Sequence, residues 1–159
     1  MIIEPKIEME TSLLTSRFNA HLTFNVLNTL QYLVLEGGKE DAYNLIGSYS
    51  RLLRSMLIND SIHTTIGSEL EIVTDYLELE RIRMDDKFSY YVSVPKSFKS
   101  QLIPKSLIIS IVENAVKHGL RPLGRDGFIK IDCPIPGGNI IRIKNNAPAV
   151  RYPKENGEG

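Results

Sequence analysis

Apolar positions recur at helical spacing through the first 58 residues of the chain. Residues 8–35 and residues 40–58 each repeat hydrophobic side chains every three or four positions. Gly37 and Gly38 lie between them and predict a break. Two helices joined by so short a connection form a helical hairpin. The predicted buried positions are Leu13, Ala20, Phe24, Leu27, Leu30 and Val34 in the first helix, and Leu45, Ile46, Tyr49, Leu52, Leu53, Met56 and Leu57 in the second.

The hairpin carries more apolar surface than two helices can cover. One pair of helices buries only the faces that meet each other, so part of each stripe stays in water. Because pairing of two hairpins into a four-helix bundle buries such stripes, we expect a homodimer. The dimerisation unit is predicted to span residues 8–60.

The polar segment 59–66 separates the hairpin from a further helix. Ser68 suits the N-cap position, and Glu71 three residues later completes a capping box. The hydrophobic pattern then predicts a helix that runs to about Met84. This helix opens a second predicted unit, which covers residues 66–159.

Three short segments of this second unit have the pattern of strands. Residues 88–94 alternate and are followed by Pro95, which cannot continue a ladder. Residues 127–133 and 140–144 are rich in isoleucine, and Pro-Gly-Gly-Asn at 136–139 predicts a hairpin turn between them. The whole pattern therefore predicts an α+β fold.

One more helix is predicted between the first and second strands. Pro104 suits its first turn and Gly119 its C′ position. The predicted buried stripe is Leu107, Ile108, Ile111, Val112 and Ala115, and the predicted polar face is Ser110, Asn114, Lys117 and His118. An amide oxygen on such a face can bind Mg²⁺, and a lysine one turn later can contact a phosphate. The alternative is that these polar residues only solvate the exposed face of a core helix.

Charge and composition narrow the class of protein. Nineteen basic residues balance nineteen acidic ones, which indicates neither a nucleic-acid-binding surface nor a membrane-surface patch. Cys133 is the single cysteine and cannot form an internal disulfide, which fits a reducing cytosol. We find no apolar run of membrane-spanning length and no signal peptide. We therefore expect a cytoplasmic location and no nucleic-acid partner.

A polar seam on the first helix holds a candidate nucleophile. Arg17, His21, Asn25 and Asn28 follow one another at steps of four, four and three residues. A histidine on this seam is exposed, and its neutral imidazole is a competent nucleophile near neutral pH. The alternative is a solvated surface histidine of a helical bundle.

Four segments together resemble one protein family. Glu-Asn-Ala-Val-Lys-His-Gly at 113–119 resembles the N box of the Bergerat (GHKL) ATP-binding fold, in the form found in LytS/YehU-type sensor histidine kinases. NAHLTFNVLN at 19–28 is similar to that family's phosphoacceptor motif. RLLRSML at 51–57 and ELEIVTDYLELERIR at 69–83 resemble two more of its signatures, and the order and spacing agree. The resemblance covers residues 12–150.

The resemblance implies a fold and a function. The fold would be a dimeric four-helix bundle followed by the N-terminal part of a Bergerat α/β sandwich. The function would be that of a kinase in a two-component phosphorelay, with His21 as phosphoacceptor beside Asn25 and a response-regulator aspartate as the acceptor of the phosphate. Mg-ATP would be the nucleotide. Asn114 would hold Mg²⁺, and Lys117 and His118 would lie near the phosphates. Membrane association would come only from the sensor segments that such relatives carry upstream.

The sequence departs from the family pattern where the adenine should bind. The family has a DNGPG-like segment, and residues 145–149 correspond to it. Asn145 replaces the carboxylate, and Ala147 and Ala149 replace glycines. The closing half of the sandwich is also missing from the 159 residues. We therefore expect impaired ATP binding. A non-enzymatic dimeric histidine phosphotransferase or scaffold with a vestigial nucleotide domain stays open as the alternative, as does a plain helical interaction domain.

Overall fold

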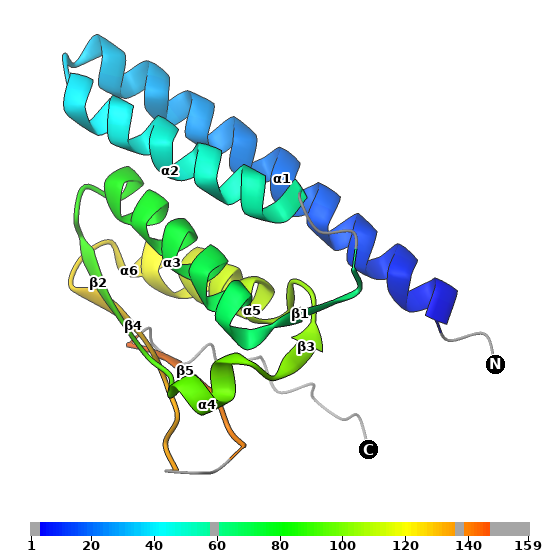
Figure 1. The fold of residues 1–159 in the computed structure, drawn as a ribbon. Coiled ribbons are helices and arrows are strands. Elements are labelled where there is room, and N and C mark those ends of the chain that lie inside the picture. Colours follow the sequence, from blue (N-terminus) through cyan, green and yellow to red (C-terminus); the bar gives the residue numbers. More distant parts are fainter. Residues whose placement is uncertain (1–3, 58–60, 136–138, 147–159) are drawn as a thin grey trace, which may run out of the picture.

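A computed structural model of the chain describes residues 4–57, 61–135 and 139–146. Two long antiparallel helices, α1 (Glu4–Leu35) and α2 (Lys39–Leu57), lie side by side along one edge of the molecule (Figure 1). Gly37 between them has φ of 79°, a left-handed conformation that glycine adopts without a steric penalty. The two helices and the break between them were predicted from the sequence.

Only part of the predicted apolar stripe is buried within this hairpin. Leu45 and Leu52 of the predicted stripe are completely buried, and Leu22 and Val26, which the stripe predicted for the first helix did not include, are buried as well. Three stripe residues expected to be buried are exposed instead, namely Phe24 (68%), Leu27 (50%) and Val34 (68%). They are exposed in the single chain because α2 covers only one face of α1, and their predicted burial depends on the homodimer, which stays a prediction. Ile46 on α2 is likewise 51% exposed.

The helix α3 (Ile66–Arg83) forms the centre of the molecule. It contacts α2 on one side and α5 on the other, so that the hairpin, the α3 and α5 layer and the sheet follow one another (Figure 1). Its N-cap is Thr65, whose side chain accepts a hydrogen bond from the backbone N–H of Ser68 at 3.1 Å. The predicted N-cap at Ser68 is therefore wrong, because the N-cap lies three residues earlier and the helix begins at Ile66.

The main sheet has the order β2–β4–β5. Strands β2 (Phe88–Ser93) and β4 (Gly127–Asp132) are parallel, whereas β4 and β5 (Arg142–Asn145) are antiparallel. Ile129 and Ile131 of β4 are fully buried. These strands agree with the prediction. The turn predicted at 136–139 falls largely on residues 136–138, which lie outside the described residues.

A second, two-stranded sheet was not predicted. Strand β1 (His63–Thr65) pairs antiparallel with β3 (Leu102–Pro104), and the short helix α4 (Lys96–Lys99) precedes β3. This pairing holds the segment before α3 against the segment before α5, and so fixes where both helices begin.

The predicted bounds of the next helix are wrong at both ends. Helix α5 (Leu107–Ala115) begins three residues after Pro104, which closes β3. It continues into a π-helical turn, η1 (Val116–Leu120), and a short helix, α6 (Arg121–Leu123). Gly119 is buried inside η1, and the left-handed glycine that ends the run is Gly124, with φ of 74°.

The buried side of α5 also differs from the prediction. Leu107 and Ile111 are 45% and 47% exposed, whereas Ile108, Ile109 and Val112 are buried. The molecule is α+β as predicted, while the dimeric bundle and the Bergerat sandwich remain predictions. No helix in the described ranges is both long and apolar enough to cross a bilayer.

Candidate functional site

His21 lies on an exposed part of α1, which runs unbroken through the motif. The side-chain amide nitrogen of Asn25, one turn later, is 3.1 Å from its Nδ1. An amide NH₂ can only donate, so in this arrangement Nδ1 accepts and the neutral imidazole carries its proton on Nε2. If the amide turns by 180°, its oxygen accepts from Nδ1–H and the lone pair of Nε2 becomes free. The predicted pair is therefore in contact. The side chain of Arg17 lies outside the described residues.

The predicted phosphate-binding residues lie at the end of α5 and in the π-helical turn. Asn114 is exposed on α5, and Lys117 and His118 are exposed on η1. π-Helical turns are rare and occur frequently at functional sites. All three side chains are accessible to a ligand, as the sequence predicted.

The donor chemistry at Asn114 suits Mg²⁺ only together with a nucleotide. The described residues contain no group of three or more His, Cys, Asp or Glu side chains that could hold a metal ion. Asn114 offers one amide oxygen, whereas Mg²⁺ takes six ligands and usually keeps several waters and substrate phosphates. Asn114 would thus be one ligand of an ion that is otherwise held by phosphate oxygens and water.

Asn145 ends strand β5, which contacts α5. The side chain of its neighbour Asn146 forms hydrogen bonds to the backbone at the start of β4. The Asn146 side-chain oxygen accepts from the N–H of Phe128 at 2.8 Å, and its amide donates to the carbonyl of Asp126 at 2.8 Å. Asn145, the candidate adenine-binding residue, thus ends a strand that contacts α5. Ala147 and Ala149 lie outside the described residues.

The start of α5 is held by a residue whose role the sequence analysis missed. The side chain of Glu69, on α3, is fully buried. Its carboxylate accepts hydrogen bonds from the backbone N–H groups of Ser106 (2.7 Å), Ile108 (3.1 Å) and Ile109 (3.3 Å). A helix N-terminus leaves such groups without partners, and an anion there is favourable. Glu69 is the first residue of the motif at 69–83, which was the available signal.

A second buried carboxylate, Glu80, lies at the other end of α3. It is fully buried and forms ion pairs with Arg83 and Arg121, the latter through two contacts of 3.1 Å. Burial raises the pKa of the Tyr76 hydroxyl well above its usual range, and the nearby negative charge of Glu80 adds to the effect. The Glu80 carboxylate is thus shielded from water, and two guanidinium groups balance its charge.

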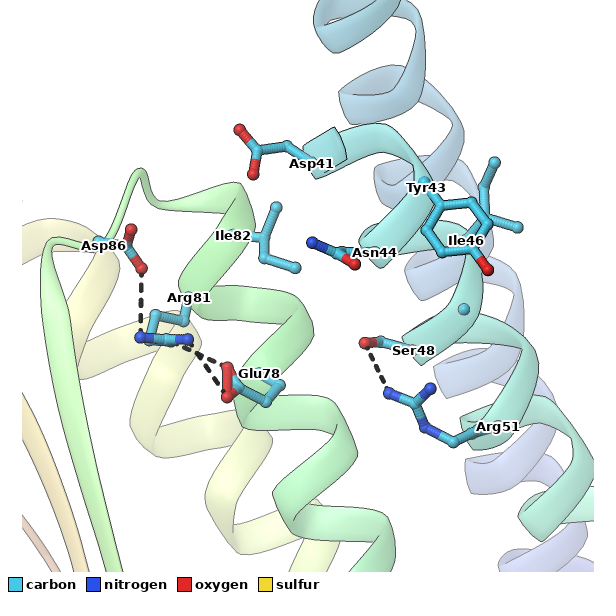
Figure 2. Close-up of a pocket in the computed structure, with 11 residues that line it drawn as sticks. Asp41, Tyr43, Asn44, Ile46, Ser48, Arg51, Glu78, Arg81, Ile82 and Asp86 are labelled. Atoms are coloured by element: carbon cyan, nitrogen blue, oxygen red, sulfur yellow. Dashed lines mark hydrogen bonds and ion pairs between the residues drawn. The ribbon is translucent and has the colours of Figure 1, made fainter. Parts of the chain in front are cut away.

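A cleft of about 520 Å³ opens between α2 and the C-terminal part of α3 (Figure 2). Figure 2 shows Arg81 bonded to Glu78 and Asp86, and Arg51 bonded to Ser48. Arg51 also pairs with Asp75 at 3.4 Å. None of the predicted site residues lines this cleft. Because both guanidinium groups are already paired, we assign it no ligand.

Comparison with known proteins identifies the family to which these motifs belong. The family model described as histidine kinase matches residues 9–88. This chain belongs to the histidine kinase family. The matched region of this family member contains His21, Asn25 and both buried glutamates of α3. The resemblance to LytS-type sensor kinases is therefore confirmed.

Three relatives extend the match of this chain beyond the family model. It is 31% identical to the sensor histidine kinase BtsS of Escherichia coli K12 over 153 residues, which is 96% of the chain and 27% of that protein. It is 35% identical to the sensor protein LytS of Staphylococcus haemolyticus, covering 96% of the chain and 24% of that protein. It is 26% identical to the sensor histidine kinase YesM of Bacillus subtilis, and this match covers 90% of the chain and 25% of that protein. The chain thus spans about a quarter of the length of these relatives.

Proposed function

We propose that the chain is part of a two-component sensor histidine kinase, in which His21 accepts a phosphoryl group and passes it to an aspartate of a response regulator. The observation that carries this proposal is the exposed imidazole of His21 with Asn25 at its Nδ1, within a helix of the matched family region. The names of the relatives support the same role.

The contact with Asn25 suggests which nitrogen reacts. Nδ1 is occupied by the Asn25 amide, while Nε2 lies at the far side of the ring. With the amide oxygen turned towards Nδ1–H, the Nε2 lone pair attacks phosphorus and the bond from phosphorus to the leaving group breaks. The ring then carries positive charge, which the amide oxygen stabilises through the Nδ1–H bond. Loss of the Nδ1 proton to water restores a neutral ring.

ATP is the expected phosphodonor, with impaired affinity in this chain. Asn114, Lys117 and His118 are exposed and can meet the phosphates and their Mg²⁺. Asn145, however, offers no negative charge to the adenine amino group, and a neutral acceptor makes the weaker bond. This substitution favours the second candidate function, a dimeric phosphotransferase or scaffold that handles phosphate without using ATP.

The ATP affinity separates the two candidates. We expect calorimetry with Mg-ATP to detect no binding at low-micromolar ligand. A dissociation constant of about 10 µM, or about −7 kcal/mol, would contradict this expectation. Asn145→Asp should recover little affinity, because it restores the charged acceptor while Ala147 and Ala149 still replace the glycines of the family pattern. Asn139→Asp is the control, because it adds the same charge at an exposed position before β5.

Chemical labelling tests the role of His21. Treatment with phosphoramidate, a donor that transfers its phosphoryl group with loss of ammonia, should add an acid-labile, base-stable phosphate. His21→Gln should abolish the label. His63→Gln should leave it intact, because His63 is equally exposed but lies in β1. Label that persists in His21→Gln would overturn the proposal.

A further inference from the structure

Glu80 joins two parts of the molecule that are far apart in the sequence. Its carboxylate is completely buried in α3 and receives two guanidinium groups, those of Arg83 and Arg121. Water and salt screen the attraction between a buried carboxylate and its two cationic partners far less than they screen a surface ion pair. The ion pairs of Glu80 are therefore suited to fix the relative positions of Arg83 and Arg121.

One of these guanidinium groups reaches the phosphoacceptor helix. Arg83, whose side chain is 14% exposed, donates from Nε to the hydroxyl of Thr29 on α1 at 3.3 Å. That hydroxyl in turn donates to the backbone carbonyl of Asn25 at 2.9 Å. The Asn25 amide contacts Nδ1 of His21 at 3.1 Å. A series of polar contacts thus runs from Glu80 to the backbone of Asn25, the residue whose side chain contacts the imidazole.

The other guanidinium group, that of Arg121, lies next to the segment that carries the candidate phosphate-binding residues. Arg121 directly follows the π-helical turn η1, which holds Lys117 and His118. A π-helical turn contains one more residue than an α-helical turn, so conversion between the two shifts every following residue in register. Arg121 would move with such a shift, and Glu80 lies at its guanidinium.

The contacts of α1 with its neighbours include apolar ones and a hydrogen bond between the hydroxyls of Thr23 and Tyr49. Leu22 and Val26 are buried against the rest of the core. Such contacts set the distance of a helix from its neighbours but are non-directional. The hydrogen bond from Arg83 to Thr29 is directional, so it can fix the rotation and axial position of α1 about two turns after His21.

We infer that Arg83 is a positioning residue for His21, acting through Thr29 and Asn25, and that Glu80 and Arg121 link this position to the π-helical turn η1. The inference rests on the proposed function of His21 for its effect on phosphorylation, but the positioning itself has a readout that needs no phosphate. Buried ion pairs add little net stability compared with apolar packing, whereas they can specify one arrangement.

Two measurements on the whole chain test this inference. The nitrogen-15 chemical shifts of the His21 ring report the ratio of its two neutral tautomers, with exposed His63 as the internal reference. The rate of labelling by phosphoramidate reports its reactivity. The variants are Arg83→Lys, Arg83→Met, Thr29→Val, Arg121→Met and the double variant Arg83→Met with Thr29→Val. Arg81→Met is the matched control, since Arg81 lies on the same helix and pairs with Glu78 at a more exposed position.

The conservative variant separates positioning from a merely structural role. Arg83→Lys keeps a positive charge beside Glu80, so the denaturation midpoint should stay near that of the wild type. A single amino group cannot replace the guanidinium fork that bonds Glu80 and Thr29 together. The tautomer ratio of His21 should therefore move towards that of His63, and labelling should slow about three- to thirtyfold. Thr29→Val should produce the same change, and the double variant no more than either single one.

The outcomes are distinct. Unchanged tautomer ratios and labelling rates in Arg83→Lys and Thr29→Val would overturn the inference while leaving His21 as the phosphoacceptor. A wild-type chain without label at His21 would overturn the proposed function, and the tautomer ratios would still decide the positioning. A change in Arg81→Met equal to that in Arg83→Met would show a non-specific effect of lost charge and overturn the inference. An unshifted tautomer ratio in Arg121→Met would overturn the link to the π-helical turn η1.

Discussion

Single residues hold the candidate site together at points that local sequence patterns do not reveal. The contact of His21 with Asn25 follows from a spacing of four residues on a helix, so it could be predicted. The cap that Glu69 provides joins residues that are 37 to 40 positions apart. Such a contact depends on how α3 and α5 pack, and neither helix contains this information alone.

The cap makes Glu69 a critical residue for stability. Glu69→Ala should lower the free energy of unfolding by about 2–4 kcal/mol, because buried N–H groups at the start of α5 lose a charged acceptor. Glu71→Ala is the control. Glu71 lies on the same helix but is exposed, so its loss should change stability by less than about 0.5 kcal/mol. Urea denaturation measures both, and equal effects would contradict the assigned role of Glu69.

Among the elements, the regular helices and strands were predicted well, whereas the run from α5 to α6, which contains the π-helical turn η1, was not. Helices α1, α2 and α3 and strands β2, β4 and β5 follow the hydrophobic periodicity. The run from α5 to α6 was misread because Gly119 resembles a C-cap. Gly119 is instead buried in the π-helical turn, where tertiary packing overrides the local signal. Likewise, the sequence pattern predicts Pro104 in the first turn of a helix, whereas Pro104 completes the pairing of β3 with β1.

Close packing of the π-helical turn against β4 predicts a requirement for Gly127. A Cβ atom at this position would lie 2.7 Å from Cδ2 of Leu120 and 3.2 Å from Cβ of Phe88. Both neighbours are buried and have little room to move. Gly127→Ala should therefore destabilise the protein by about 1–3 kcal/mol.

Gly47 in α2 provides a control, because alanine at this position should stabilise the protein instead of destabilising it. A Cβ atom there would meet only Nη1 of Arg51 at 3.6 Å, an ordinary contact. Gly47→Ala should stabilise the protein by about 0.5–1 kcal/mol, since alanine loses less backbone entropy in a helix. The shift of the urea midpoint measures both variants. Shifts of the same sign would show that packing at η1 is not as tight as described.

For the whole molecule, the sequence predicted the separation into a helical hairpin and an α/β part, and it predicted more apolar surface than the hairpin can bury. The exposure of Phe24, Leu27 and Val34 gives that surplus a location on α1. The arrangement of α3 between the hairpin and the sheet could not be predicted, because it depends on contacts between distant segments.

The exposed stripe predicts a homodimer. Sedimentation at tens of micromolar should give a dimer, and Leu27→Glu should give a monomer because it places an unpaired charge in the bundle core. Leu102→Glu is the matched control, since Leu102 is 69% exposed but lies on β3. A wild-type monomer, or a dimer that survives Leu27→Glu, would contradict the bundle.

The nitrogen that carries the phosphoryl group tests the role of His21 most directly. Phosphorus and nitrogen NMR of the labelled chain distinguishes Nδ1-phosphohistidine from Nε2-phosphohistidine. Because Asn25 occupies Nδ1 at 3.1 Å, we predict a single phosphate on Nε2 of His21. A phosphate on Nδ1, or on any other residue, would contradict the proposed role of the His21 and Asn25 pair.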